Sequence, residues 1–258
     1  MSLRFFFSMD EYAVICDYDG FLVDSGPVRR EFYRYLCRKY GKEMPEKKLQ
    51  KLDYNGLSIC RPYRFKETEN IVLPAETIYD LMGFDWEKDK GMIWDEFIEY
   101  FLKHPPLMFP GIKKSLIRLK AKDFKIALAT SNSRELVLPF IERKGLEHVF
   151  DVVVTKENVE KPKPYPDMLV KCSEGLGIPR EKCLYGGDEI ADLMAAKLAG
   201  IAVVGAGYGL TPQEVMLQFI NKDRFVERPE DLADVMLKNI AYLQKIQDLR
   251  AKAQKLLL

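Results

Sequence analysis

The sequence predicts an α/β protein in which a doubly wound parallel sheet carries an inserted α-helical domain. Short apolar segments rich in β-branched residues alternate with segments of helical periodicity, which is the pattern of a parallel sheet covered by helices on both faces. About a hundred residues without a strand pattern separate the first two strands, far more than a simple crossover needs. Polar residues follow several strands at their carboxyl ends, where such sheets bind ligands.

Five segments are predicted to be the strands of the sheet. They are short and apolar, and most end near glycine or aspartate, which favours strands over buried helices. They lie at residues 12–17, 124–130, 151–155, 182–186 and 201–205.

The long interval after the first strand predicts a helical cap domain at residues 25–105. Apolar residues recur at helical spacing in three of its segments, at residues 26–40, 75–82 and 92–102. We expect the chain to re-enter the core through His104-Pro105-Pro106, which leaves residues 1–24 and 106–258 as the α/β core domain.

Helices of the core are indicated by their ends. Asn132 and Glu135 fit a capping box for a helix over residues 134–144, and Thr211 with Glu214 fits another. The tail, residues 229–258, has apolar residues on one helical face. We expect that face to pack on the core, with a homodimer contact as the alternative, so the chain is expected to be a monomer or a homodimer.

Composition excludes several classes of function. In 258 residues, 40 basic side chains balance 39 acidic ones, so no nucleic-acid partner is expected. No apolar run is long enough for a membrane span, and the first residues do not fit a signal peptide. The five cysteines, without CxxC spacing, argue against disulfides or a zinc cluster, and a cytoplasmic location is expected.

Only two histidines are present, so a histidine-based triad or a multi-histidine metal site would be difficult to assemble. Carboxylates are therefore the candidate catalytic groups. In the segment AVICDYDGFLVD, a predicted buried strand ends at Asp17 and Asp19. The two residues lie on one face of an extended chain and could reach one ligand.

Other strand ends supply further polar groups. Thr130, Ser131 and Asn132 place hydroxyls and backbone N–H groups at a helix start, a suitable cradle for phosphate, although Asn132 and Ser133 could simply cap that helix. In KPKPYPD, prolines hold Lys161 and Lys163, which could instead be surface charges.

The stretch GGDEIAD follows the fourth strand. Asp188 and Asp192 are one helical turn apart and can face one point, or they could only cap the helix. Gathered at one edge, Asp17, Asp19, Asp188 and Asp192 would repel one another and need a counter-ion. Oxygen ligands favour a hard cation, and Mg²⁺ is expected. Acids, a cation, a lysine and N–H donors together suit phosphoryl transfer.

The stretches DYDGFLVD, ALATSN, KPKPYPD and GGDEIAD, in this order, resemble the four motifs of the haloacid dehalogenase superfamily. The resemblance is greatest to phosphoglycolate-phosphatase-like members, with β-phosphoglucomutase-like members also similar. It implies a Rossmann-like core, a helical cap inserted after the first motif, and Mg²⁺-dependent hydrolysis of a small phosphorylated metabolite, phosphoglycolate-like or a sugar phosphate.

The resemblance also implies roles for individual residues. Asp17 would be the nucleophile that forms an aspartyl-phosphate, and Asp19 the general acid and base. Thr130 and Lys163 would bind the transferring phosphoryl group, together with Gly20, Ser131 and Asn132. The metal would be held by Asp17, the Asp19 backbone carbonyl, Asp188 and, directly or in support, Asp192.

Two alternatives stay open: a phosphomutase, which Gly187-Asp188 disfavours because many mutases of this type have Glu-Asp there, and a non-catalytic metal- or phosphate-binding scaffold. Phe21 and Glu189 depart from the family pattern, which leaves metal coordination and site shape undecided.

In the cap, Arg61 or Arg64 is expected to contact the substrate tail, although either could be a surface arginine.

Overall fold

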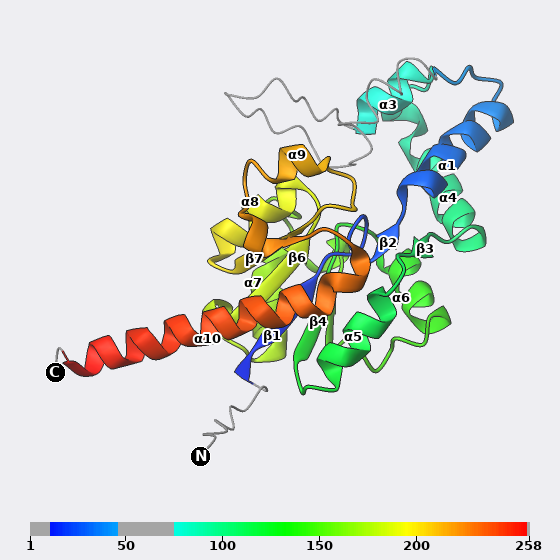
Figure 1. Ribbon diagram of the computed structural model, residues 1–258. Coiled ribbons are helices and arrows are strands. Elements are labelled where there is room, and N and C mark those ends of the chain that lie inside the picture. Colours follow the sequence, from blue (N-terminus) through cyan, green and yellow to red (C-terminus); the bar gives the residue numbers. More distant parts are fainter. Residues whose placement is uncertain (1–10, 46–74, 257–258) are drawn as a thin grey trace.

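The computed structural model describes residues 11–45 and 75–256. Within these residues, six parallel strands form one sheet in the order β5–β4–β1–β6–β7–β8 (Figure 1). The strands are β1 (Ala13–Cys16), β4 (Lys125–Ala129), β5 (Val152–Val154), β6 (Cys183–Gly187), β7 (Ala202–Ala206) and β8 (Phe225–Val226). The predicted doubly wound parallel sheet is confirmed. Strand β8 was not predicted, because two residues are too few to show a period.

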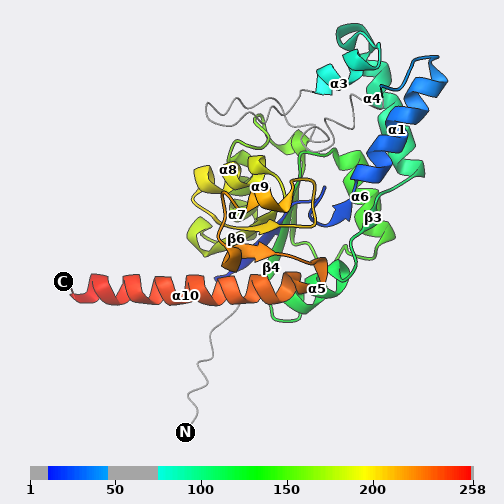
Figure 2. The same cartoon turned by 45° about the horizontal axis from the view of Figure 1, so that its top comes forward.

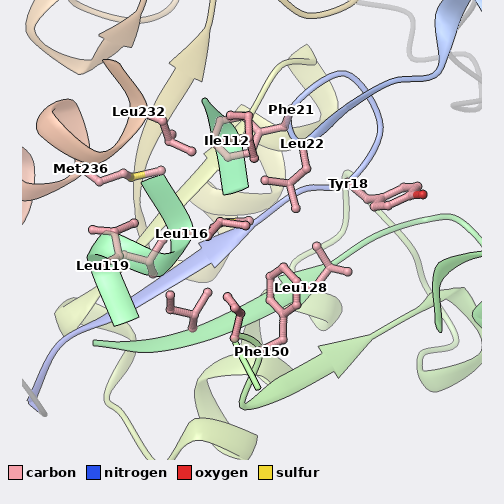
Figure 3. Close-up of a cluster of buried hydrophobic side chains, with 14 of the residues drawn as sticks. Tyr18, Phe21, Leu22, Ile112, Leu116, Leu119, Leu128, Phe150, Leu232 and Met236 are labelled. Atoms are coloured by element: carbon pink, nitrogen blue, oxygen red, sulfur yellow. The ribbon is translucent and has the colours of Figure 1, made fainter. Parts of the chain in front are cut away.

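Alternate residues of the central strand β1 point to opposite faces of the sheet. Val14 and Cys16 belong to the hydrophobic cluster on one face, which is covered by α5 (Ile112–Lys120), α6 (Arg134–Arg143) and α10 (Leu232–Leu256). Figure 3 shows this cluster, with side chains of α5 and α10 meeting above the strands.

Ala13 and Ile15 point to the other face of the sheet. There they pack with side chains of α7 (Asp167–Leu176) and α8 (Ile190–Ala199) in a second cluster. Because both faces of β1 are covered, the strand is continuously apolar until it ends at Asp17, which places that carboxylate at the edge of the sheet.

A helical insertion interrupts the α/β core after β1. The chain leaves along β2 (Val23–Asp24) and returns along β3 (Leu107–Met108), and these two strands pair antiparallel. The described helices between them are α1 (Gly26–Lys39), α3 (Ala75–Leu81) and α4 (Trp86–Lys103) (Figure 1). The predicted insertion is therefore present, while its boundaries at 25 and 105 stay a prediction.

The insertion has its own aromatic-rich hydrophobic cluster, formed by side chains of α1, α3 and α4. Phe32 lies at its centre, with its ring centroid 5.3 Å from that of Phe97. Leu136 of α6 also belongs to this cluster, so the insertion packs on the core as well as on itself.

The long helix α10 is buried against the core mainly over its first half, although Gln247 still donates to the Glu181 carbonyl at 3.3 Å. Leu232, Met236 and Ile240 are buried, whereas Tyr242 and Leu249 are more than half exposed. The second half extends beyond the sheet (Figure 2). The predicted packing of the tail on the core is thus confirmed for the first half.

Short elements complete the described fold. They are α9 (Gln213–Met216) and the 3₁₀ turns η2 (Lys156–Asn158), η3 (Arg180–Lys182), η4 (Lys222–Arg224) and η5 (Pro229–Asp231). Helix α9 has Pro212 as its N-cap residue rather than the predicted Thr211. None of the helices in the described residues is both long enough and apolar enough to pass through a lipid bilayer.

Candidate active site

The predicted site residues meet where three neighbouring strands end. Asp17 follows β1, Thr130 follows β4, and Asp188 follows β6, and β1 lies between the other two strands. Backbone hydrogen bonds continue past the strand ends, since the Asp17 N–H donates to the Gly186 carbonyl at 2.8 Å. The topology therefore brings together side chains that are more than a hundred residues apart in the sequence.

Lys163 is the buried cation of the site. Its Nζ lies 2.6 Å from Asp17 Oδ1 and 2.7 Å from Asp192 Oδ1, and it donates to the Tyr185 hydroxyl at 3.2 Å. Burial lowers the pKa of this amine, but the two aspartates raise it further, so the pKa of Lys163 is raised overall. The alternative of a surface charge is excluded for Lys163. Lys161, in contrast, is exposed.

Both carboxylate oxygens of Asp192 accept hydrogen bonds. Its Oδ1 accepts from Lys163 and from the Tyr185 hydroxyl, which lies at 2.7 Å. Its Oδ2 accepts from the backbone N–H groups of Asp188 at 3.0 Å and Glu189 at 2.9 Å. Glu189 is the N-cap of α8 and its carboxylate accepts from the backbone N–H of Asp192 in turn. The helix-capping alternative therefore applies to Asp192, and it accounts for Glu189 as well.

Asp188 differs from Asp192 because one of its carboxylate oxygens accepts no hydrogen bond in the described chain. Its Oδ2 accepts from the Leu210 N–H at 2.6 Å, whereas its Oδ1 is buried and has no hydrogen-bond partner within the described chain. Two glycines lie against it. A Cβ on Gly20 would lie 2.0 Å from Asp188 Oδ2, and one on Gly209 would lie 2.3 Å from Asp188 Cβ. Bare backbone is therefore required on both sides of this carboxylate.

Three buried carboxylates lie around Lys163. Oxygens of Asp17, Asp188 and Asp192 all lie within 4.8 Å of one another. Two unit charges at that distance repel by roughly 3.5 kcal/mol at an effective dielectric constant of ~20. Burial raises the pKa of the Asp17 carboxyl, against the opposing effect of Lys163, and burial also raises the pKa of Asp188. One lysine does not balance three carboxylates, and the unpartnered Asp188 Oδ1 fits a hard divalent cation.

The carboxylate of Asp19 lies outside that group of three. Its Oδ2 accepts from Asn132 Nδ2 at 3.1 Å, and its Oδ1, which makes no hydrogen bond in the described structure, lies 3.7 Å from a guanidinium nitrogen of Arg29 on α1. One oxygen is thus fixed by the core, while the other is left for contact with a ligand.

Asn132 does not form the predicted capping box. The N-cap of α6 is Ser133, without a side-chain cap hydrogen bond, and Asn132 instead accepts from the Ser133 N–H with its Oδ1 at 2.8 Å. The prediction of a cap by Asn132 and Glu135 was wrong, because the amide group of Asn132 is used to hold Asp19. Asn132 is a site residue for a different reason from the one that its spacing indicated.

The loop after β4 presents two hydroxyl side chains. Thr130 is buried and its Oγ1 accepts from the Asn132 N–H at 3.0 Å, which folds the loop into a tight turn. Ser131 Oγ is buried and has no hydrogen-bond partner in the described chain. It is a donor available to an anion at this position.

A cavity of about 230 Å³, which we call the site cavity, opens between the core and the helical insertion. The predicted site residues that line it are Asp17, Asp19, Thr130, Ser131, Asn132 and Lys163. The insertion contributes Arg29, Trp94 and Phe97, and the core adds Lys156, Lys161, Pro162, Tyr165 and Glu189.

Sequence reasoning missed Arg29, Trp94, Lys156 and Tyr185 as site residues. These residues belong to no motif with a fixed spacing. Tertiary packing alone decides which face of α1 or α4 lies against the core. The candidate substrate residues Arg61 and Arg64 lie outside the described residues.

Phe21, the other departure from the family pattern, turns away from the cavity. It is fully buried, and a Cβ on Gly186 would lie 2.2 Å from its Cζ. Its ring also stacks on Tyr208 with centroids 6.5 Å apart. Phe21 therefore fills space beneath the loop that carries Asp17 and Asp19, and its role is in packing.

Comparisons with known proteins identify the family of the chain. Residues 14–206 match the family model of haloacid dehalogenase-like hydrolases. A phosphorylated carbohydrates phosphatase of Thermotoga maritima is 32% identical over 210 residues, 80% of this chain and 90% of that protein. The pyrophosphatase PpaX of Halalkalibacterium halodurans is 30% identical over 233 residues, 88% of this chain and 98% of that protein.

A solved structure gives the same result for the fold. The crystal structure of β-phosphoglucomutase from Clostridium difficile superposes with a TM-score of 0.64 over 90% of this chain and 98% of that chain. At 20% sequence identity, this likeness concerns the fold alone.

Proposed function

Because the chain belongs to the haloacid dehalogenase-like hydrolase family, we propose that it is a Mg²⁺-dependent phosphatase that hydrolyses a small phosphomonoester through an aspartyl-phosphate. The resemblance carried by the four sequence motifs is confirmed by the family match. The relatives named above include one phosphatase for phosphorylated carbohydrates and one for pyrophosphate, and both substrates are small phosphorylated molecules.

One observation carries the proposal: Asp17 is buried against Lys163 at the wall of a cavity that also holds a second, separately fixed carboxylate, Asp19. A nucleophile and an acid must be different groups with different surroundings. Asp17 lies in the carboxylate cluster, whereas Asp19 is held by Asn132 through one oxygen and faces the Arg29 guanidinium at 3.7 Å with the other.

In the first step, an oxygen of Asp17 attacks phosphorus and forms the O–P bond of an aspartyl-phosphate. The bond from phosphorus to the alcohol oxygen breaks, and Asp19 gives its proton to that oxygen. In the second step, Asp19 takes a proton from water and the water oxygen attacks phosphorus. The bond between phosphorus and the Asp17 oxygen then breaks, which releases phosphate and restores the Asp17 carboxylate.

The phosphoryl oxygens need donors during both steps. Lys163 is placed for this by Asp17 and Asp192, and Ser131 Oγ and Thr130 lie on the adjoining wall of the cavity. Gly20 directly follows Asp19, and its backbone lies against Asp188. These contacts support the assignment of phosphate binding to the loop after β4.

Asp17 and Asp188 are the residues that would hold Mg²⁺, because Asp188 Oδ1 is buried without a hydrogen-bond partner in the described chain and the Asp17 carboxylate lies in the same cluster. Asp192, whose oxygens both accept hydrogen bonds already, would act in support by fixing Lys163 and the start of α8. When bound, the ion would neutralise the carboxylate cluster and stabilise charge on the phosphoryl oxygens.

The test is a phosphate-release screen over small phosphomonoesters, with and without Mg²⁺, with Asp17→Asn as the blank. We expect metal-dependent release by the native protein and none by the variant. Interconversion of sugar phosphates without phosphate release would support the phosphomutase alternative. Release that is equal in the native protein and in Asp17→Asn would refute the proposal.

A further inference from the structure

Lys156 lies in the wall of the site cavity, beside the loop that follows β4. It is the first residue of η2, and its backbone N–H donates to the Asn132 carbonyl at 3.3 Å. Its side chain crosses toward the helical insertion, where Nζ lies 3.3 Å from the centroid of the Trp94 ring on α4. Lys156 and Trp94 both line the cavity.

The ammonium group of Lys156 has no hydrogen-bonded anion in the described structure. The carboxylates that act on it are Glu157 and Glu135, and Glu157 already accepts from Thr155 Oγ1 at 2.6 Å and from the Arg134 N–H at 3.2 Å. Burial lowers the pKa of Lys156, although both glutamates oppose this effect. A partly desolvated cation without an anion at hydrogen-bond distance is incompletely compensated.

The ring of Trp94 fixes this cation without neutralising it. A cation over an aromatic face is attracted by the ring quadrupole, but its N–H groups remain available for acceptors. Trp94 is itself braced by Phe97, with ring centroids 5.4 Å apart and planes at 23°. The pair therefore presents a positioned positive charge to the cavity, separate from the Lys163 that meets Asp17.

We propose that Lys156, held against Trp94, binds a second anionic group of the substrate, a carboxylate or a phosphate, at the end remote from the phosphoryl group that is transferred. This inference rests on the proposed phosphatase function and gives its substrate class: phosphomonoesters with a second negative charge. An ammonium is a point charge and suits either anion.

Two matched substrate pairs distinguish the possible anions. 3-Phosphoglycerate has a carboxylate where glycerol 3-phosphate has a hydroxymethyl group, and fructose 1,6-bisphosphate adds a phosphate to fructose 6-phosphate. For each pair, the quantity measured is the kcat/KM of the doubly anionic substrate divided by that of its partner. We expect a ratio above one for at least one pair in the native protein.

Substitution at Lys156 then tests the residue. Lys156→Met should lower that ratio by at least about tenfold, the size of one charge-assisted hydrogen bond. Lys156→Arg should retain most of it. The matched control is Lys114→Met on α5, an exposed lysine outside the site cavity, which should leave the ratio unchanged.

Two results would overturn the inference: a ratio of one in both pairs for the native protein, or an equal loss of kcat/KM for both members of a pair in Lys156→Met. The second result would show that Lys156 only joins the insertion to the core.

Calorimetric dissociation constants for the same pairs, measured on Asp17→Asn with and without Lys156→Met, separate this inference from the proposed function. If no substrate releases phosphate, the phosphatase proposal fails. A binding ratio that falls on Lys156→Met would still support the anion subsite, and one that does not fall would refute it.

Discussion

The two sides of the site cavity are built in opposite ways. On the core side, Asp17, Lys163 and Asp192 are buried and joined by hydrogen bonds of 2.6 and 2.7 Å. On the insertion side, Trp94 is 37% exposed and meets Lys156 only through its ring face. A transferring phosphoryl group needs fixed charges, whereas a variable substrate tail needs surfaces that can be changed without loss of the fold. We propose that the buried cluster of the core performs the chemistry and that the contact between Lys156 of the core and Trp94 of the insertion sets the selectivity.

The largest effect is expected at Asp17. Asp17→Asn keeps the shape of the side chain but removes the nucleophile, so turnover should fall by at least about 10⁴-fold. The measurement is phosphate release, together with trapping of labelled phosphate on the native protein in acid. Asp80→Asn, at an exposed aspartate of α3, is the control and should retain turnover. Turnover by Asp17→Asn within tenfold of native would contradict the division of roles.

Lys163 should matter for stability as well as for turnover. Lys163→Met leaves Asp17 and Asp192 buried without their cation, and breaking a buried ion pair on one side costs about 3–5 kcal/mol. Urea unfolding without Mg²⁺ measures this free energy. The control is Lys161→Met two residues away, where the exposed side chain should change the free energy of unfolding by less than about 0.5 kcal/mol. Equal effects in the two variants would show that Lys163 is not structurally required.

The carboxylate cluster predicts a dependence on both metal and pH. Because folding raises the pKa of Asp188, the folded state keeps the proton of this carboxyl to a higher pH than the unfolded state does. Without a cation, stability from this group is therefore lost as pH rises above the unfolded value of ~4. In the presence of a chelator, the free energy of unfolding of Asp188→Asn should rise relative to that of the native protein as pH rises.

Mg²⁺ should reverse this effect in the native protein. At a concentration 100 times the dissociation constant, a bound ion adds about 2.7 kcal/mol to the free energy of unfolding. Thermal unfolding should shift upward by several degrees in the native protein and not in Asp188→Asn, with Na⁺ at equal ionic strength as the control. A shift that is the same in both proteins would place the ion elsewhere.

The smallest effect is expected on the insertion side. Trp94→Leu removes the ring beneath Lys156, and a cation–π contact of about 1 kcal/mol corresponds to a roughly fivefold change in kcat/KM for doubly anionic substrates. Trp86→Leu is the matched control, since Trp86 stacks on Tyr79 with ring centroids 5.2 Å apart and does not line the site cavity. A similar change in substrate ratio in both variants would mean that the insertion acts only through its packing.

The sequence alone was sufficient for every strand of the described sheet except β8, and it indicated the residues of the four motifs. Strand β1 could be predicted because it is buried on both faces and must be apolar throughout, and Asp17 because a charge at the end of such a strand is unusual. These signals are local, since each depends on residues within a few positions of one another.

Only the tertiary structure showed how the remaining groups are used. Asn132 has the spacing of a helix cap, yet it holds Asp19, a residue 113 positions away. Trp94 and Lys156 meet because α4 packs over the core, and their linear sequence context contains no sign of that contact. Packing of separate elements decides such contacts, and a pattern within one segment cannot encode the position of another.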